Sequence, residues 1–250
     1  MKKTVKIIAV VSVLIILIAG GYVGNMFGLF NSGNYIKFTP DSSVTQGSAL
    51  QGKTVLFLGS SVTFGYGSLG TSFVEYLEEA EGIIPVKEAV SGTTLADLKK
   101  SSYVFRLKEI DTSIEADAFV CQLSTNDATK NVPLGEITDS LDISTFDTST
   151  VTGAIEYIIS YVKSTWDCPV IFYTNSRYDS EAYDRMVDAL SEIAVKHGIS
   201  VIDLWNDEEF NNISDEQRRL YMIDSVHPTK AGYSQWWLPE FQKALHNTIR

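Results

Sequence analysis

Short apolar runs and helical patterns alternate along the chain from residue 53 onwards. The first run, residues 55–58, has no polar interruption, which is typical of a strand buried on both faces of a parallel sheet. Strands that alternate with helices form βαβ units, so the sequence predicts an α/β fold with a mainly parallel five-stranded sheet covered on both faces. Strands are expected at 54–58, 84–89, 118–123, 170–174 and 200–204, and helices at 72–81, 94–103, 152–166, 180–196 and 231–247.

The N-terminus has the pattern of a targeting segment. Lys2, Lys3 and Lys6 precede an apolar run over residues 7–19. A basic segment followed by an apolar core indicates either an uncleaved signal anchor or a signal peptide cut near residues 19–21. We expect the lysines on the cytoplasmic side, a hydrophobic helix in contact with the membrane, and the body of the protein in an extracytoplasmic location.

These patterns divide the chain into three parts. Residues 1–30 form the signal anchor or signal peptide, residues 31–52 a linker rich in turn residues, and residues 53–250 the main domain. A short edge strand is expected within the linker, at 35–38. Two long polar loops, 127–151 and 205–223, are expected near the carboxyl edge of the sheet, where long loops are often functional.

Charge and cysteine content restrict the function classes. The formal net charge is −11, and the body is more acidic still without the three N-terminal lysines. Such a body repels a phosphate backbone, so we expect no nucleic-acid partner. Cys121 and Cys168 fall at predicted strands and are expected to be small buried residues, with a bridge between neighbouring strands as the alternative. The sequence has no CxxC motif and no Cys/His cluster, so no structural metal site is expected.

Two serines follow the first predicted strand. The apolar run ends at Gly59, and Ser60 and Ser61 come next. Ligands of open α/β sheets bind at the carboxyl ends of the strands, so a serine here is a candidate nucleophile. The alternative is that Ser60 or Ser61 only caps the next helix.

One of the three histidines has a carboxylate at a suitable spacing. His227 follows Asp224 by three residues and precedes Pro228. In a turn, this spacing lets the carboxylate accept the imidazole Nδ1–H, which leaves Nε2 free to accept a proton. Serine needs such a base because its free hydroxyl is a poor nucleophile. The other two histidines, His197 and His246, lie on predicted helices and are interpreted as structural.

Two further strand ends carry groups that could stabilise negative charge. Asn126 follows the third predicted strand, and its side-chain amide could donate a hydrogen bond to a developing oxyanion. Gly92 follows the second predicted strand, and its backbone N–H could do the same. The structural alternatives are an Asx turn at Asn126 and a plain strand-to-helix turn at Gly92.

A nucleotide-binding fold is the first competing interpretation. Residues 65–70 read Gly-x-Gly-x-x-Gly, and Glu88 lies near the end of the next predicted strand, as in dinucleotide-binding folds. However, those glycines should follow the first strand directly, and here residues 60–64 intervene. This interpretation also leaves Asn126, Asp224 and His227 without a role.

From residue 53 to 245 the sequence resembles the SGNH hydrolases of the GDSL-like esterase superfamily. The family's Gly-Asp-Ser block corresponds to residues 59–61, its second-block glycine to Gly92, its Gly-x-Asn-Asp block to 124–127, and its Asp-x-x-His block to 224–227. Ser60 replaces the usual aspartate of the first block, and Ser124 replaces the glycine of the third. The resemblance implies a three-layer α/β/α sandwich of the flavodoxin-like kind.

The resemblance also implies a mechanism without a cofactor or metal. Ser61 is the implied nucleophile, His227 the base and Asp224 the residue that orients it, while Ser61, Gly92 and Asn126 form the oxyanion hole. We expect a small acyl ester as substrate, with an O-acetylated carbohydrate first and a lysophospholipid or thioester as alternatives. A non-catalytic glycan-binding module is the other alternative. Four side chains are candidates for the pocket lining: Tyr66, Tyr173, Arg177 and Tyr221.

Overall fold

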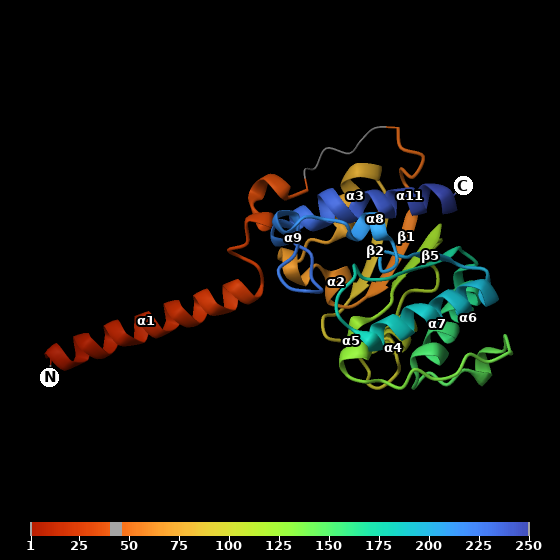
Figure 1. Cartoon of the computed structure of the whole chain (residues 1–250), viewed down its shortest axis with the longest axis horizontal. Coiled ribbons are helices and arrows are strands. Elements are labelled where there is room, and N and C mark those ends of the chain that lie inside the picture. The colour runs from red at the N-terminus through yellow and green to blue at the C-terminus, as the bar shows by residue number, and fades with distance from the viewer. Residues whose placement is uncertain (1, 41–46, 250) are drawn as a thin grey trace.

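The computed structural model describes residues 2–40 and 47–249, with the backbone alone for residues 2–11 and 26. Its centre is a parallel sheet of five strands in the order β2-β1-β3-β4-β5 (Figure 1). All four pairs of neighbouring strands are parallel, as predicted. The strands are β1 (Thr54–Gly59), β2 (Ile84–Ala89), β3 (Ala118–Gln122), β4 (Val170–Tyr173) and β5 (Ser200–Ile202).

Helices cover both faces of the sheet, because successive residues of the central strands point to opposite sides. Leu56 and Leu58 of β1 pack in one apolar cluster with α4 (Tyr103–Leu107), α6 (Val151–Trp166) and α7 (Glu181–His197). Val55 and Phe57 pack in a second cluster with α3 (Phe73–Glu81) and α11 (Leu238–Thr248). Figure 1 shows these two helix layers on either side of the strands. The protein therefore has the α/β architecture that the sequence predicts.

The prediction of a helix at 94–103 was wrong. The backbone there forms turns, and the helix α4 begins only at Tyr103. The N–H groups of Leu95 and Ala96 donate to the side-chain carboxylate of Asp127 at 2.7 and 3.0 Å. These two donors therefore bond to a residue distant in the sequence and not to the backbone carbonyls of a helix.

Three other segments differ from their predictions. Residues 35–38 form no edge strand; they contain a 3₁₀ turn, η2 (Ile36–Phe38). The region 205–223 is not one open loop, since α8 (Glu208–Asn211) and α9 (Asp215–Tyr221) begin at the capping side chains of Asp207 and Ser214. The final helix is divided into α10 (Lys230–Gly232), a wide π-helical turn η5 (Tyr233–Trp237) and α11.

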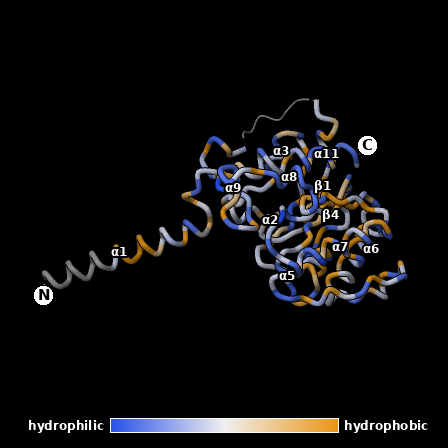
Figure 2. The backbone as a smooth tube through the Cα atoms, viewed as in Figure 1, coloured by the Kyte–Doolittle hydropathy of each residue, from blue (hydrophilic) through white to orange (hydrophobic). Residues whose placement is uncertain are grey.

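The N-terminal segment forms one long helix, α1 (Lys2–Met26), which extends away from the body (Figure 1). Its apolar side chains from Val13 to Ile18 are exposed, and Figure 2 shows this hydrophobic stretch outside the globular part. Within the described residues, however, no helix is long and apolar enough to cross a membrane. The signal anchor or signal peptide expected within residues 1–30 stays a prediction. The division into residues 1–30, 31–52 and 53–250 remains a prediction.

Both cysteines are free and buried, as predicted. Burial raises the pKa of Cys168 to about 11, and it raises the pKa of Cys121 well above its ordinary value. Both side chains thus belong to the apolar core next to the sheet.

Candidate active site

The serines after β1 have different surroundings. Ser60 is completely buried; its hydroxyl contacts the side-chain oxygen of Gln122 at 3.3 Å and accepts a hydrogen bond from the amide of Asn126 at 3.2 Å. Ser60 precedes α2 (Ser61–Phe64), but its side chain makes no capping hydrogen bond. Ser61 begins α2 and points to a histidine instead, so neither serine acts as a simple side-chain cap.

Ser61, His227 and Asp224 form one chain of hydrogen bonds. Ser61 Oγ lies 2.8 Å from His227 Nε2, and His227 Nδ1 lies 2.8 Å from Asp224 Oδ2. The other carboxylate oxygen, Oδ1, accepts the backbone N–H groups of Val226 and His227 at 2.8 and 2.7 Å. These two backbone bonds fix the carboxylate within its turn. The Nδ1 contact favours a proton on Nδ1, which leaves Nε2 as the acceptor toward Ser61.

The pKa of Asp224 lies below its ordinary value of 3.8. Burial, the largest single influence, would raise it, but the hydrogen bond and charge of His227 and the two backbone donors together outweigh burial. Asp224 is therefore a carboxylate throughout the neutral range, as an orienting partner for an imidazole must be.

An open cleft of about 500 Å³ lies beside this chain, at the carboxyl ends of β1, β2 and β3. It is in the size range of small-molecule sites. Its lining includes Ser61, Gly92, Asn126, Asp224 and His227, so all five predicted site residues share one cavity. The remaining lining residues are Tyr66, Ser91, Thr125, Thr129 and Val226.

Comparison with known proteins assigns the chain to a family. The model of the GDSL-like lipase/acylhydrolase family matches residues 57–235, which is more than half of the chain. The chain belongs to this family. It is accordingly a carboxylic ester hydrolase of the SGNH type. No curated protein matches the chain.

Solved structures share the fold of this GDSL-like hydrolase at low sequence identity. A protein from Lactobacillus plantarum is 19% identical with a TM-score of 0.68, and the alignment covers 80% of this chain and 99% of the other. A member of the lipolytic protein G-D-S-L family from Veillonella parvula DSM 2008 is 16% identical with a TM-score of 0.57, covering 78% and 98%. At these identities, the likeness shows the fold.

The cleft of the GDSL-like hydrolase depends on a buried carboxylate that sequence reasoning assigned no role. Asp127 is fully buried and receives the N–H groups of Leu95 and Ala96, so it holds the loop that follows Gly92. Burial raises the pKa of Asp127 above 3.8, and the two backbone donors only partly offset this shift. The signal was present in the sequence, because Asp127 ends the third family block.

Arg106 is a second supporting residue that sequence reasoning missed. Its guanidinium is buried and donates to the carbonyl of Gly59 at 2.7 Å, to that of Glu88 at 3.0 Å and to the hydroxyl of Thr93 at 3.1 Å. Arg106 thereby ties together the ends of β1 and β2 and the loop carrying Gly92. A single basic residue inside an otherwise apolar helical stretch was the available signal.

Only one of the four candidate lining side chains belongs to the cleft. Tyr66 lines it, and its ring lies 5.0 Å from the imidazole ring of His227. Tyr173 is fully buried with its hydroxyl 2.6 Å from that of Thr63, Arg177 packs over the ring of Trp205, and Tyr221 stacks on Trp236. These three are not among the described residues that line the cleft.

The Gly-x-Gly-x-x-Gly stretch at 65–70 has a packing role in this hydrolase. A Cβ at Gly67 would lie 2.6 Å from the carbonyl oxygen of Pro228 and 3.0 Å from His227 Cβ. The middle glycine therefore lets this turn approach the loop that carries His227. This contact accounts for the middle glycine of the motif without a nucleotide.

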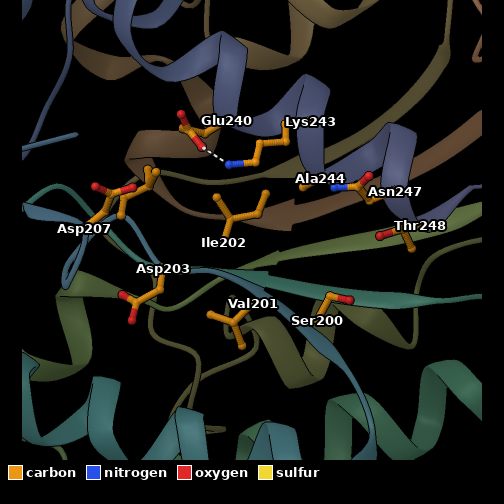
Figure 3. Close-up of a pocket in the computed structure, with 11 residues that line it drawn as sticks. Ser200, Val201, Ile202, Asp203, Asp207, Glu240, Lys243, Ala244, Asn247 and Thr248 are labelled. Carbon is orange, nitrogen blue, oxygen red and sulfur yellow. Dashed lines mark ion pairs between the residues drawn. The ribbon is translucent and has the colours of Figure 1, made fainter. Parts of the chain in front are cut away.

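A second cavity lies at the other edge of the sheet, between β5 and α11 (Figure 3). Ile202 faces the helix that carries Glu240 and Lys243, which form an ion pair at 3.9 Å, whereas Val201 packs on the opposite face of the sheet. Its described lining residues include none of the five predicted site residues. In the part of the chain that the structure describes, no group of three or more His, Cys, Asp and Glu side chains could hold a metal ion.

Proposed function

We propose that the protein hydrolyses a small acyl ester with Ser61 as nucleophile, His227 as general base and Asp224 as the residue that orients His227. The observation that carries this proposal is the continuous hydrogen-bonded chain from Ser61 Oγ through the imidazole to Asp224, at the edge of an open cleft. This order of groups is the arrangement that activates a serine hydroxyl.

The proposed reaction has two stages. Ser61 Oγ attacks the ester carbonyl carbon while His227 Nε2 takes the hydroxyl proton. The tetrahedral intermediate then expels the alcohol, whose oxygen receives that proton from His227. In the second stage, water attacks the acyl-enzyme, His227 takes a proton from the water, and Ser61 Oγ leaves with that proton as the acid is released.

Three donors are positioned to stabilise the negative oxygen of each tetrahedral intermediate. Ser61 is the first residue of α2, and the first N–H groups of a helix have no partner within it. Gly92 and Asn126 line the same cleft, and the amide of Asn126 is oriented by its hydrogen bond to Ser60. We assign the oxyanion hole to the N–H groups of Ser61 and Gly92 and the side-chain amide of Asn126.

The cleft lining supports a short acyl group on a polar alcohol, with an O-acetylated carbohydrate as the first candidate. Ser91, Thr125 and Thr129 offer hydroxyl groups to a sugar, and Tyr66 and Val226 offer apolar side-chain surface to an acyl chain. A lysophospholipid carries a long acyl chain, which would extend beyond this lining. We also propose an extracytoplasmic location, on the support of the basic segment and apolar run at the N-terminus.

The test is turnover of p-nitrophenyl esters by the wild type and Ser61→Ala. We expect hydrolysis of the acetate that is faster than that of the octanoate, and we expect it to disappear in Ser61→Ala. Activity that survives this substitution would contradict the catalytic assignment, and a preference for the octanoate would contradict the short-acyl proposal. A wild type that binds acetylated glycans without cleaving any ester would favour the binding-module alternative.

A further inference from the structure

A segment that the sequence presents partly as a linker is packed against the candidate active site. We call residues 27–34 the N-terminal clasp; it runs from the end of α1 through the turn η1 (Ser32–Asn34). Asn34 is 7% exposed and makes three hydrogen bonds to backbone groups. Its amide donates to the carbonyls of Gly28 and Gly67, both at 2.8 Å, and its oxygen accepts the N–H of Lys230 at 2.9 Å.

These three bonds join separate parts of the site. Gly67 belongs to the turn that follows the Ser61 helix, and Lys230 begins α10, three residues after His227. One buried side chain therefore links the part of the chain that carries Ser61 to the part that carries His227. An amide is suited to this position because it donates and accepts at once.

The clasp also fits closely against the loop 221–229, which carries Asp224 and His227. A Cβ at Gly33 would lie 1.9 Å from the carbonyl oxygen of Leu220 and 2.4 Å from Thr229 Oγ1, so only glycine fits there. The loop itself is closed by backbone bonds from Thr229 N to Tyr221 O at 2.8 Å and from Ile223 N to His227 O at 3.0 Å. The clasp supports this closed loop from outside.

Aromatic rings provide a third contact between the clasp and the site. The ring of Phe27 lies 5.0 Å from that of Tyr66, and the ring of Tyr66 lies 5.0 Å from the imidazole of His227. Phe27 therefore packs against the ring of Tyr66, which in turn contacts the imidazole of His227. The imidazole keeps only 18% of its side-chain surface exposed, whereas Asp224 keeps 47%.

We propose that the N-terminal clasp is a working part of the active site and that Asn34 is a positioning residue, which keeps His227 within hydrogen-bond reach of Ser61. This proposal rests on the proposed function, because it assigns Asn34 to the same serine–histidine pair. The effect should be large for a residue that touches no substrate, since a misplacement of about 1 Å can cost about 10²-fold in rate.

The experiment compares Asn34→Ala with Asn211→Ala in the full chain. Asn211 is a matched control, because its amide donates to the carbonyls of Leu204 and Asp207, both at 2.7 Å, and its oxygen accepts the N–H of Arg177 at 2.9 Å. Both variants lose comparable bonds to the backbone. We expect both to melt at a lower temperature, and only Asn34→Ala to lose kcat, by about 10²-fold with little change in KM.

The rate of covalent modification of Ser61 by diethyl p-nitrophenyl phosphate gives a second readout, because it reports the activated serine without a bound ester substrate. We expect Asn34→Ala to slow it as much as it lowers kcat. Phe27→Ala should lower both kcat and the modification rate as well. Because the ring of Phe27 is partly exposed, this variant serves as the test if Asn34→Ala does not fold. Wild-type kcat and modification rates in the folded variants would overturn the proposal. Ester hydrolysis by the Ser61→Ala variant would instead overturn the proposed function.

Discussion

The Nε2 atom of His227 lies 2.8 Å from Oγ of Ser61, although 166 residues separate the two in the chain. Ser61 follows the interior strand β1, and His227 follows the edge strand β5. Their contact is possible because all five strands are parallel, which places the carboxyl ends of the strands at one edge of the sheet.

Removal of the base or of its orienting carboxylate should nearly abolish esterase activity. We expect His227→Ala and Asp224→Asn each to lower kcat by about 10³- to 10⁴-fold. The first change removes the base, and the second replaces the charged acceptor of the Nδ1–H group with a neutral amide that can donate to Nδ1 and favour the wrong tautomer. Steady-state hydrolysis of p-nitrophenyl acetate measures the loss. Combining either substitution with Ser61→Ala should add little further loss, since groups that act as one unit are not additive. Losses that multiply would show that the three residues act separately.

The amide of Asn126 should matter for the rate and little for binding. We expect Asn126→Ala to lower kcat by about 10²- to 10³-fold with KM almost unchanged, because an oxyanion donor acts mainly in the transition state. Asn206→Ala is the control, since the amide of Asn206 also follows a strand but bonds to Asp203 at 2.8 Å, outside the cleft. An equal rise in KM with unchanged kcat would assign Asn126 to ground-state binding instead.

A comparison of substitutions at Gly92 and Gly198 distinguishes the effect of backbone strain on stability from an effect on catalysis. Both have positive φ, 79° and 61°, and a Cβ at either would meet no atom within 4 Å. We expect Gly92→Ala and Gly198→Ala to destabilise the fold by a similar amount, about 1 kcal/mol, measured by chemical denaturation. Only Gly92→Ala should also lower kcat, because its N–H would shift in the cleft. Equal activity of the two variants would remove Gly92 from the oxyanion hole.

The buried carboxylate of Asp127 should leave a signature in the pH dependence of stability. Because its pKa is raised in the folded protein, the native state holds the proton more tightly than the unfolded state. Its contribution to the free energy of unfolding is therefore complete below about pH 3.8 and declines as the pH rises through the raised pKa. The free energy of unfolding of the wild type minus that of Asp127→Asn should therefore fall as the pH rises through that window.

Asp111→Asn provides a control of opposite sign for this measurement. Asp111 is exposed, and the N–H and hydroxyl of Ser113 lower its pKa, so its stabilising contribution exists above the ordinary pKa and is lost as the pH falls. The free energy of unfolding of the wild type minus that of Asp111→Asn should therefore rise with pH. Parallel trends for the two positions would contradict the assigned shifts.

Local pattern predicts most of the sheet and of the long helices. Each of the five strands begins at the predicted residue. The interior strands β1, β3 and β4 are the clearest signals, because their apolar runs are buried on both faces of the sheet. The helix α7 ends at His197 and is followed by Gly198, as its basic last turn and the glycine indicate. The residues 94–103 were mispredicted because Asp127, which binds their N–H groups, lies some thirty residues away, and helical periodicity does not detect such a partner.

The named residues of the candidate site are likewise local signals at strand ends, and the structure brings them to one cleft. Their supports are not local. Arg106 acts on carbonyls 47 and 18 residues away, and Asn34 acts on a backbone N–H 196 residues away. Nothing near Asn34 in the sequence distinguishes it from an ordinary turn residue, so its contacts were visible only in three dimensions.

The strand order has a consequence for the timing of activity. Ser61 follows β1, an interior strand and the first along the chain, whereas His227 comes after β5, the last strand. Under the proposed mechanism, a ribosome must therefore translate through residue 227 before an ester can be cleaved, and an unfinished polypeptide is inactive. In refolding from denaturant, esterase activity should then return only when the segment that carries His227 has packed onto the sheet. This return should come later than the recovery of the circular dichroism signal from the first strands and helices.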